Sequence, residues 1–318
     1  MGKAALFFDF MASRTVGTGF TEEWGPHLDI FARQVVEGFI TGLHKSPFHG
    51  FSVEFAEHRL YNPGESVRNI DWKLYGRTEK LFVKRFEEET NLRCHLVIDR
   101  SSSMYYPTKE QNKLTFSVYA AAALIYLFRK QRDAFGLISL SDRVEFTSPA
   151  KSTMVHQKYL YAELERMLQQ RIRPQRTALA EVLHQIAEML HKRSMVIIFS
   201  DMFETVRPDD QSSLFGALQH LRHNKHEVIV FNVLDHAREV EFDFGNRPYH
   251  FVDLETGEEL KLHPLQVRDT YRNAVNAFRK DLALKCAQYH IDLVDADIQS
   301  GYTHVLQEYL IKRSRMGG

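Results

Sequence analysis

The polar stretch at residues 99–103, Asp-Arg-Ser-Ser-Ser, holds the side chains of this sequence best suited to binding chemistry. It follows an apolar run, residues 92–98, that has the length and polar flanks of a buried strand. Asp99, Ser101 and Ser103 would then place three hard oxygen donors at the carboxyl end of a strand, where open α/β sheets bind ligands. Mg2+ accepts such a set of one carboxylate and several hydroxyls. The alternative is a polar loop that caps the next helix.

Two further oxygen-bearing residues lie at comparable places later in the chain. Thr177 opens an expected helix after a basic loop, and Asp201 follows the apolar run 194–199. If the strands before Asp99 and Asp201 are parallel neighbours, the five side chains share one edge of the sheet. Thr177 could instead be a helix N-cap, and Asp201 could simply end a strand. The five residues in this order favour a metal site formed by Asp99, Ser101, Ser103, Thr177 and Asp201.

Alternating strand and helix patterns surround these residues and predict the fold. Apolar runs predict strands over residues 92–98, 133–140, 144–146, 194–199, 226–234 and 291–294. Helical spacing predicts helices over residues 28–43, 113–132, 155–170, 178–192, 210–223, 265–289 and 305–313. A hairpin-like passage is expected from Phe242–Phe244 and residues 251–254. Strand–helix–strand units predict an α/β fold with a mostly parallel sheet and helices on both faces.

The pattern changes along the chain and suggests boundaries. We expect a disordered N-terminus over residues 1–20, a helical segment over 21–49 and a small β subdomain over 50–90. The α/β domain is expected over 91–313, with a flexible tail over 314–318. The β subdomain is predicted because polar and apolar residues roughly alternate in it and turn residues interrupt it.

Composition narrows the class of protein. The 318 residues contain 41 basic and 41 acidic side chains, so no overall charge points to nucleic acid or to an anionic membrane. Two distant cysteines give no disulfide framework and suit a reducing compartment. The first residues make a poor signal peptide, and the longest apolar stretch suits a core helix. We therefore expect a soluble cytoplasmic protein.

The order Asp99-x-Ser101-x-Ser103, then Thr177, then Asp201 resembles the metal-ion-dependent adhesion site of von Willebrand factor A domains. Residues 61–72, which end in Arg68-Asn-Ile-Asp71-Trp72, are similar to the signature of the bacterial domain of unknown function 58 family. The resemblance implies a von Willebrand factor A-like, Rossmann-type fold with the β subdomain inserted before the central strand.

The resemblance also implies roles for the five residues. Ser101, Ser103 and Thr177 would bind Mg2+ directly, and Asp99 and Asp201 would hold it mainly through water; Mn2+ and Ca2+ are the alternative ions. The family is associated with MoxR-type AAA+ ATPases, so a protein partner that supplies an acidic residue is implied. This partner would be such an ATPase or its client.

Two functions are consistent with these residues. The first is a non-enzymatic, metal-dependent protein-interaction module, with no catalytic residues, no nucleic-acid partner and no membrane insertion. The second is a metal-dependent hydrolase or phosphatase that uses Asp99. An aspartyl-phosphate enzyme usually has a second carboxylate two residues after its nucleophile, where this chain has Ser101, and the sequence has no GxxxxGK[ST] phosphate loop. His220, His223 and His226 have ligand-like spacing, but we expect them on a solvated face, not around zinc.

Overall fold

The computed structural model describes residues 28–40, 53–62, 70–88, 92–108, 111–169, 178–203, 208–254 and 258–316. The chain divides into two compact units. One comprises residues 48–92, and the other comprises residues 1–47 and 93–318. The expected disordered stretch, residues 1–20, lies outside the described residues.

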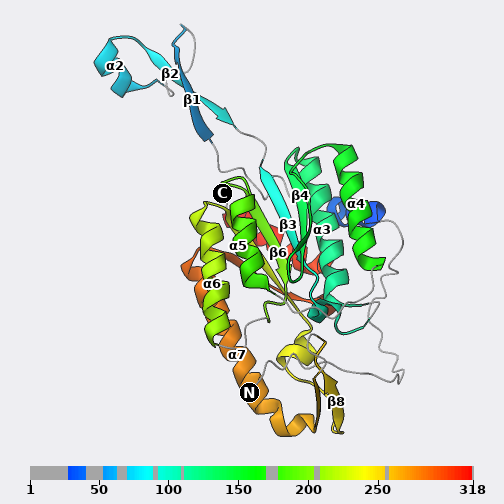
Figure 1. Cartoon of the computed structure of the whole chain (residues 1–318). Coiled ribbons are helices and arrows are strands. Elements are labelled where there is room, and N and C mark those ends of the chain that lie inside the picture. The colour runs from blue at the N-terminus through cyan, green and yellow to red at the C-terminus, as the bar shows by residue number, and fades with distance from the viewer. Residues whose placement is uncertain are drawn as a thin grey trace. The chain divides into compact units, whose positions relative to one another are not determined.

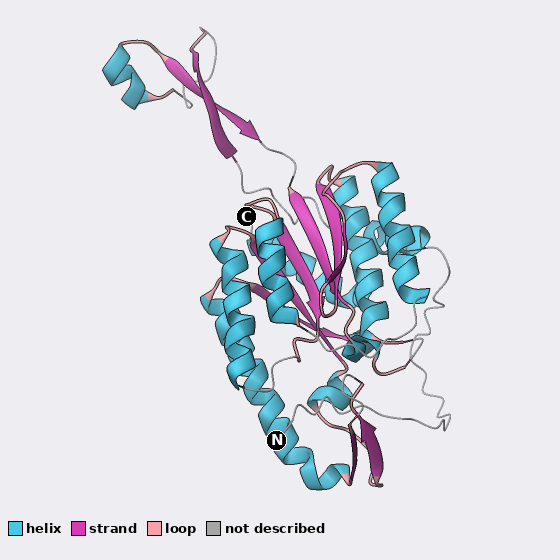
Figure 2. Cartoon of the chain, viewed as in Figure 1, coloured by secondary structure: helices cyan, strands magenta, loops and turns pink. Residues whose placement is uncertain are grey.

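The larger unit is built on a six-stranded sheet, which Figure 2 shows in magenta between helices. Its strands in spatial order are β10 (Asp292–Asp297), β7 (Glu227–Leu234), β6 (Met195–Ser200), β3 (Arg93–Asp99), β4 (Ala134–Leu140) and β5 (Val144–Thr147). All neighbours pair in parallel except β5, which is antiparallel to β4. The mostly parallel α/β sheet predicted from the sequence is confirmed.

The central strands are apolar on both faces because helices cover both sides. Val97, Ile198 and Val230 belong to a core formed with helices α5 (Leu179–Met189), α6 (Pro208–His223) and α7 (Pro264–Gln288). On the other face, the ring of Phe231 lies 5.4 Å from that of Tyr309 on α8 (Tyr302–Met316). Figure 1 shows α5, α6 and α7 on one side of the sheet, with α3 (Lys113–Lys130) and α4 (Met154–Gln169) on the other.

The helices of this unit follow the predicted pattern closely. Their bounds are α1 Leu28–Ile40, α3 Lys113–Lys130, α4 Met154–Gln169, α5 Leu179–Met189, α6 Pro208–His223, α7 Pro264–Gln288 and α8 Tyr302–Met316. Helix α8 ends at Met316, so it continues into residues 314–318, which were expected to form a flexible tail. Within the described segments, none of the helices has both the length and the hydropathy needed to cross a bilayer.

The smaller unit differs from the predicted β subdomain because it contains a helix. Strands β1 (Val53–Leu60) and β2 (Phe82–Glu88) pair in antiparallel fashion. Between them lies α2 (Trp72–Thr78). Asp71 begins this helix, because its carboxylate accepts hydrogen bonds from the backbone N–H groups of Lys73 and Leu74 at 3.0 and 3.1 Å. The prediction of a β subdomain over residues 50–90 did not include this helix or its N-cap.

The expected strand at Phe242–Phe244 is wrong. A π-helical turn, η3 (His236–Val240), precedes it, and the hairpin is formed instead by β8 (Tyr249–Val252) and β9 (Glu259–Leu262). Phe242 has a φ of 48°, a left-handed conformation that an extended strand excludes. Its ring packs 4.4 Å from that of Tyr271. The alternating aromatic residues therefore serve a local cluster, not a strand.

A buried histidine lies within the central strand β3. His95 is 6% exposed, and its Nδ1 has no hydrogen-bond partner among the described residues. Burial, reinforced by the nearby His226 and Arg93, lowers the pKa of His95 to about 4. The folded protein therefore holds His95 neutral at pH values where the unfolded chain would protonate it, since an exposed histidine has a pKa of about 6.5.

We predict that this histidine makes the fold sensitive to acid. Because its folded pKa lies below its unfolded pKa, its contribution to the free energy of unfolding is constant above pH 6.5 and falls between pH 6.5 and 4. The loss amounts to about 3 kcal/mol over that range. Urea unfolding of the wild type and of His95→Gln at several pH values measures it. The difference in the free energy of unfolding between the two proteins should shrink as the pH falls. Two curves of that free energy against pH that run parallel would contradict the prediction.

Candidate functional site

The loop that follows β3 brings the first three predicted residues together. Asp99 accepts a hydrogen bond from the Ser101 N–H on Oδ1 at 2.8 Å. The hydroxyls of Ser101 and Ser103 share a hydrogen bond, with their Oγ atoms 3.0 Å apart. A short 3-10 helix, η2 (Ser102–Tyr105), forms this turn, and the Met104 N–H donates to the Ser101 carbonyl at 3.0 Å. Asp99, Ser101 and Ser103 are nearly fully buried.

Asp201 lies beside this loop because β6 is the parallel neighbour of β3. The register pairs Ile98 with Phe199, so the two strands end side by side. Ser200, the last residue of β6, donates its hydroxyl to Asp99 Oδ2 at 2.7 Å. Asp201 itself is 3% exposed and accepts a hydrogen bond from the Phe203 N–H on Oδ1 at 3.2 Å. Asp99 and Asp201 therefore lie at the same edge of the sheet.

A buried lysine completes the charged groups at this edge. Lys113 is fully buried, and its Nζ lies 2.7 Å from Asp201 Oδ2 and 2.6 Å from Glu239 Oε1. The other oxygen of Glu239, Oε2, accepts a hydrogen bond from the Asp235 N–H at 2.8 Å, just after β7. Lys113 thus links the start of α3 to the ends of β6 and β7.

The backbone and two rings fix the position of Lys113. Asn112 caps α3 by accepting a hydrogen bond from the Thr115 N–H at 2.7 Å, and the Lys113 N–H donates to the Tyr106 carbonyl at 3.0 Å. Its ammonium group lies 5.9 Å from the centre of the Tyr106 ring and 5.8 Å from that of Phe203. At these distances an ammonium is attracted to aromatic rings.

Burial is the largest single influence on the protonation of these groups, and the neighbouring charges come second. Asp99, Asp201 and Glu239 together face one ammonium, so with all four ionised the formal charge is three negative against one positive. Burial, together with the nearby charge of Asp201, raises the pKa of Asp99 to about 7. Burial likewise raises the pKa of Glu239 to about 7, even though Lys113 lowers it. Burial alone would lower the pKa of Lys113, but Asp201 and Glu239 outweigh it and raise that pKa.

The structure brings four of the five predicted residues to one edge. Asp99, Ser101, Ser103 and Asp201 lie there, and the fifth, Thr177, lies outside the described residues.

Sequence reasoning missed Ser200, Lys113 and Glu239 as members of the site. Ser200 directly precedes Asp201, so its place at the strand end was a usable signal. Lys113 was assigned only as the start of a helix. A lysine that opens an otherwise apolar helix is an unusual residue to bury, and that was its one available signal. No sequence signal pointed to Glu239, which lies in an irregular turn after β7.

The donor set suits a small hard cation. Mg2+ binds oxygens at about 2.0–2.1 Å in octahedral geometry, which sets neighbouring ligand oxygens about 3 Å apart. The Ser101 and Ser103 hydroxyls have this spacing, 3.0 Å. In the described part of the chain no three His, Cys, Asp or Glu side chains gather as metal ligands, so a metal at this edge would depend on hydroxyl oxygens. Hydroxyls and carboxylates favour Mg2+ over softer metals.

The three histidines with ligand-like spacing, His220, His223 and His226, do not form a metal site in the described part of the chain. Nδ1 of His220 lies 3.0 Å from Nδ1 of His184, and Nε2 of His220 pairs with Glu188 at 2.8 Å. His226 is fully buried and accepts a hydrogen bond from the Ser194 N–H at 3.3 Å, so the expectation of a solvated face is wrong for His226.

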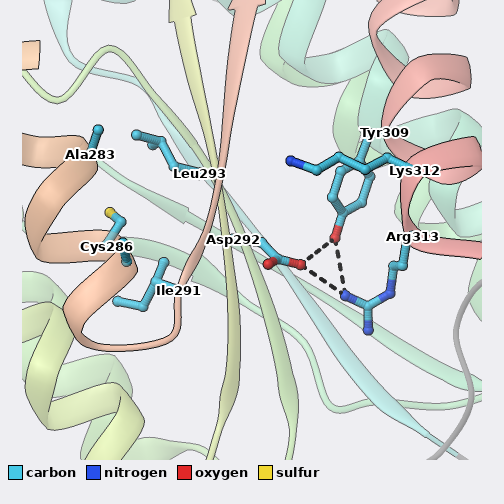
Figure 3. Close-up of a pocket in the computed structure, with 9 residues that line it drawn as sticks. Ala283, Cys286, Ile291, Asp292, Leu293, Tyr309, Lys312 and Arg313 are labelled. Carbon is cyan, nitrogen blue, oxygen red and sulfur yellow. Dashed lines mark hydrogen bonds and ion pairs between the residues drawn. The ribbon is translucent and has the colours of Figure 1, made fainter. Parts of the chain in front are cut away.

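A separate cavity of about 310 Å³ lies along the edge strand β10, between α7 and α8 (Figure 3). Asp292, the first residue of β10, accepts hydrogen bonds there from the Tyr309 hydroxyl at 3.3 Å and from Arg313 at 3.2 Å. Asp292 marks the amino end of the parallel strand, whereas Asp99 and Asp201 lie at carboxyl ends. This cavity is therefore not part of the candidate site.

Comparisons with known proteins give distant relatives. The chain is 27% identical over 262 residues to the uncharacterized protein Rv1480 of Mycobacterium tuberculosis. The aligned region covers 80% of this chain and 78% of that protein. The same values hold for the uncharacterized protein Mb1516 of Mycobacterium bovis.

Solved structures share less with this chain. An aerotolerance-related membrane protein from Bacteroides fragilis, crystallised with multiple mutations to serine, has a TM-score of 0.44 and 11% identity and covers 71% of this chain and all of that one. The conserved hypothetical protein BatB from Bacteroides thetaiotaomicron has a TM-score of 0.40 and 12% identity, with the same coverage.

A family model described as "Protein of unknown function DUF58" matches residues 57–281. This match spans most of the smaller unit and the sheet edge at which Asp99 and Asp201 lie. The chain therefore belongs to the DUF58 family.

Proposed function

We propose that the chain is a non-enzymatic, metal-dependent protein-interaction module with a von Willebrand factor A-like domain. Ser101, Ser103 and Thr177 would hold a divalent cation directly, and Asp99 and Asp201 would hold it mainly through water. Mg2+ is the proposed ion, with Mn2+ and Ca2+ as alternatives. The observation that supports the proposal is that the Ser101 and Ser103 hydroxyls and the buried carboxylates of Asp99 and Asp201 meet at one edge of the sheet.

Buried charge supports the same proposal. With all four groups ionised, Asp99, Asp201, Glu239 and Lys113 carry a formal charge of minus two, which one divalent cation would balance. Burial raises the pKa of Asp99 and of Glu239 to about 7, so it disfavours the ionised carboxylates that such a cation would stabilise. A bound Mg2+ would supply an electrophilic centre at which a carboxylate from another protein could become the last ligand.

The proposed partner is a protein that presents Asp or Glu to the ion. A MoxR-type AAA+ ATPase or its client is the first candidate, because the family that the sequence resembles is associated with such ATPases. The proposed location is the cytoplasm. Arg100 lies next to the site but forms an ion pair with Glu145, so its charge is partly offset.

A hydrolase that uses Asp99 as nucleophile is less well supported. Asp99 is 1% exposed. The residue two positions after it is Ser101, where an aspartyl-phosphate enzyme usually has a second carboxylate.

We predict that Mg2+ stabilises the folded protein through this site. At a concentration about one hundred times its dissociation constant, Mg2+ should add about 2.7 kcal/mol to the free energy of unfolding, because a ligand that binds only the folded state stabilises it. Asp99→Asn should lose most of this increment, whereas Asp269→Asn, an exposed carboxylate on α7, should keep it. Chemical unfolding with MgCl2 and with EDTA measures both. Equal Mg2+ effects in the two variants would refute the site.

Binding to a protein partner should depend on the same ion. The immobilised chain should retain a MoxR-type AAA+ ATPase in MgCl2 and release it in EDTA, because the ion would join the two proteins. Asp99→Asn should not retain it, and Asp269→Asn should. Retention that resists EDTA and survives Asp99→Asn would exclude docking through the ion. Phosphatase turnover that is lost in Asp99→Asn would favour the hydrolase instead.

A further inference from the structure

The carboxylates of the candidate site are unusually constrained by their own hydrogen bonds. Asp99 accepts from the Ser101 N–H on one oxygen and from the Ser200 hydroxyl on the other, at 2.8 and 2.7 Å. Asp201 accepts from the Phe203 N–H on Oδ1 at 3.2 Å and from the Lys113 ammonium on Oδ2 at 2.7 Å. Each oxygen of both carboxylates thus has a donor before any ion is bound.

Three of these donors are neutral and one is a fixed cation. A neutral N–H or hydroxyl leaves a carboxylate oxygen with a second lone pair for a metal or a metal-bound water. An ammonium group at 2.7 Å also carries a full positive charge, which repels a second cation from the same oxygen. Lys113 therefore restricts how Asp201 can approach an ion, whereas Ser101, Ser200 and Phe203 do not.

The position of Lys113 does not depend on Asp201 alone. Its ammonium also binds Glu239 Oε1 at 2.6 Å, and its side chain is fully buried beside the rings of Tyr106 and Phe203. Glu239 is itself held by the Asp235 N–H at 2.8 Å. The lysine cannot turn away to solvent without leaving Glu239 buried and uncompensated, a costly state.

This restriction acts differently on the two common hard cations. Ca2+ takes six to eight oxygen ligands and often a bidentate carboxylate, whereas Mg2+ takes six in a strict octahedron and keeps several waters. A carboxylate with one oxygen already bound to an ammonium cannot offer both oxygens to Ca2+. It can still offer one oxygen, or bind through water, as Mg2+ requires.

We propose that Lys113 is the specificity-determining residue of this site: by holding Asp201 Oδ2, it denies Ca2+ a bidentate ligand and makes the site selective for Mg2+. The inference rests on the proposed metal site and adds a role for a residue outside its ligand set. Lys113 acts through Asp201, and its effect should appear in the ratio of Mg2+ to Ca2+ affinity.

The test compares ion affinities in variants of the full chain. Removing Lys113 alone leaves Asp201 and Glu239 without their cation, so Lys113→Met is paired with Glu239→Gln, which removes one charge of each sign. Glu239→Gln alone is the matched control, because Lys113 then still holds Asp201. Chelator-treated protein is titrated with MgCl2 or with CaCl2, binding is followed by the shift of the thermal midpoint, and circular dichroism checks the fold.

The wild type and Glu239→Gln should prefer Mg2+ by similar factors. In K113M/E239Q the preference should fall by about tenfold or more, mainly through tighter Ca2+ binding, since groups that orient a ligand typically change metal affinity by that amount. An unchanged ratio in the folded double variant overturns the inference and leaves the proposed site intact. Absence of both Mg2+ and Ca2+ binding in the wild type overturns the proposed site and the inference with it.

A second variant keeps the test decisive if the double variant does not fold. With Lys113 in place, Asp201 is never a bidentate ligand. Asp201→Asn should therefore weaken Mg2+ binding and Ca2+ binding by factors that agree within about threefold. A much greater loss of Ca2+ binding than of Mg2+ binding would mean that Asp201 chelates Ca2+ despite the lysine, and the inference would be wrong.

Discussion

The parallel pairing of β3 with β6 is the constraint on which the rest of the candidate site depends. Both strands are buried on both faces, so a shift of one residue in their register would move every side chain to the opposite helical layer. The register is therefore set by the core, well away from any ligand. Its consequence is chemical, because it places Ser200 within hydrogen-bond distance of Asp99 and brings Asp201 to the same edge.

Charge is the second organising feature of this edge. Burying a carboxylate is costly unless it is paired, and removing one partner of a buried ion pair typically costs about 3–5 kcal/mol. Lys113 compensates Asp201 and Glu239, which anchors the start of α3 to the segment after β7. Among the described residues, the donors to Asp99 are a backbone N–H and a hydroxyl, both neutral. The positive charge at this edge is therefore distributed unevenly over the three carboxylates.

The DUF58 family match includes parts of both compact units of the chain. The matched region begins within β1 and ends within α7, so it includes α2 and β2 of the smaller unit and strands β3 to β7 of the larger sheet. In α2 no described residue is buried, and Trp72 is 62% exposed. The ring of Trp72 lies 6.2 Å from that of Tyr75, one turn further along the same helix.

The sequence by itself determined the sheet, the helices and the four described residues of the proposed metal site, because buried strands and amphipathic helices leave strong periodic signals and strand ends place polar residues predictably. The short helix α2 and the left-handed Phe242 escaped, since an N-cap and an aromatic cluster overrode the local alternation. Only the tertiary structure decided the roles of Lys113 and Glu239, which are 126 positions apart. No local pattern encodes a pair whose partners meet only when α3 and the end of β7 pack together.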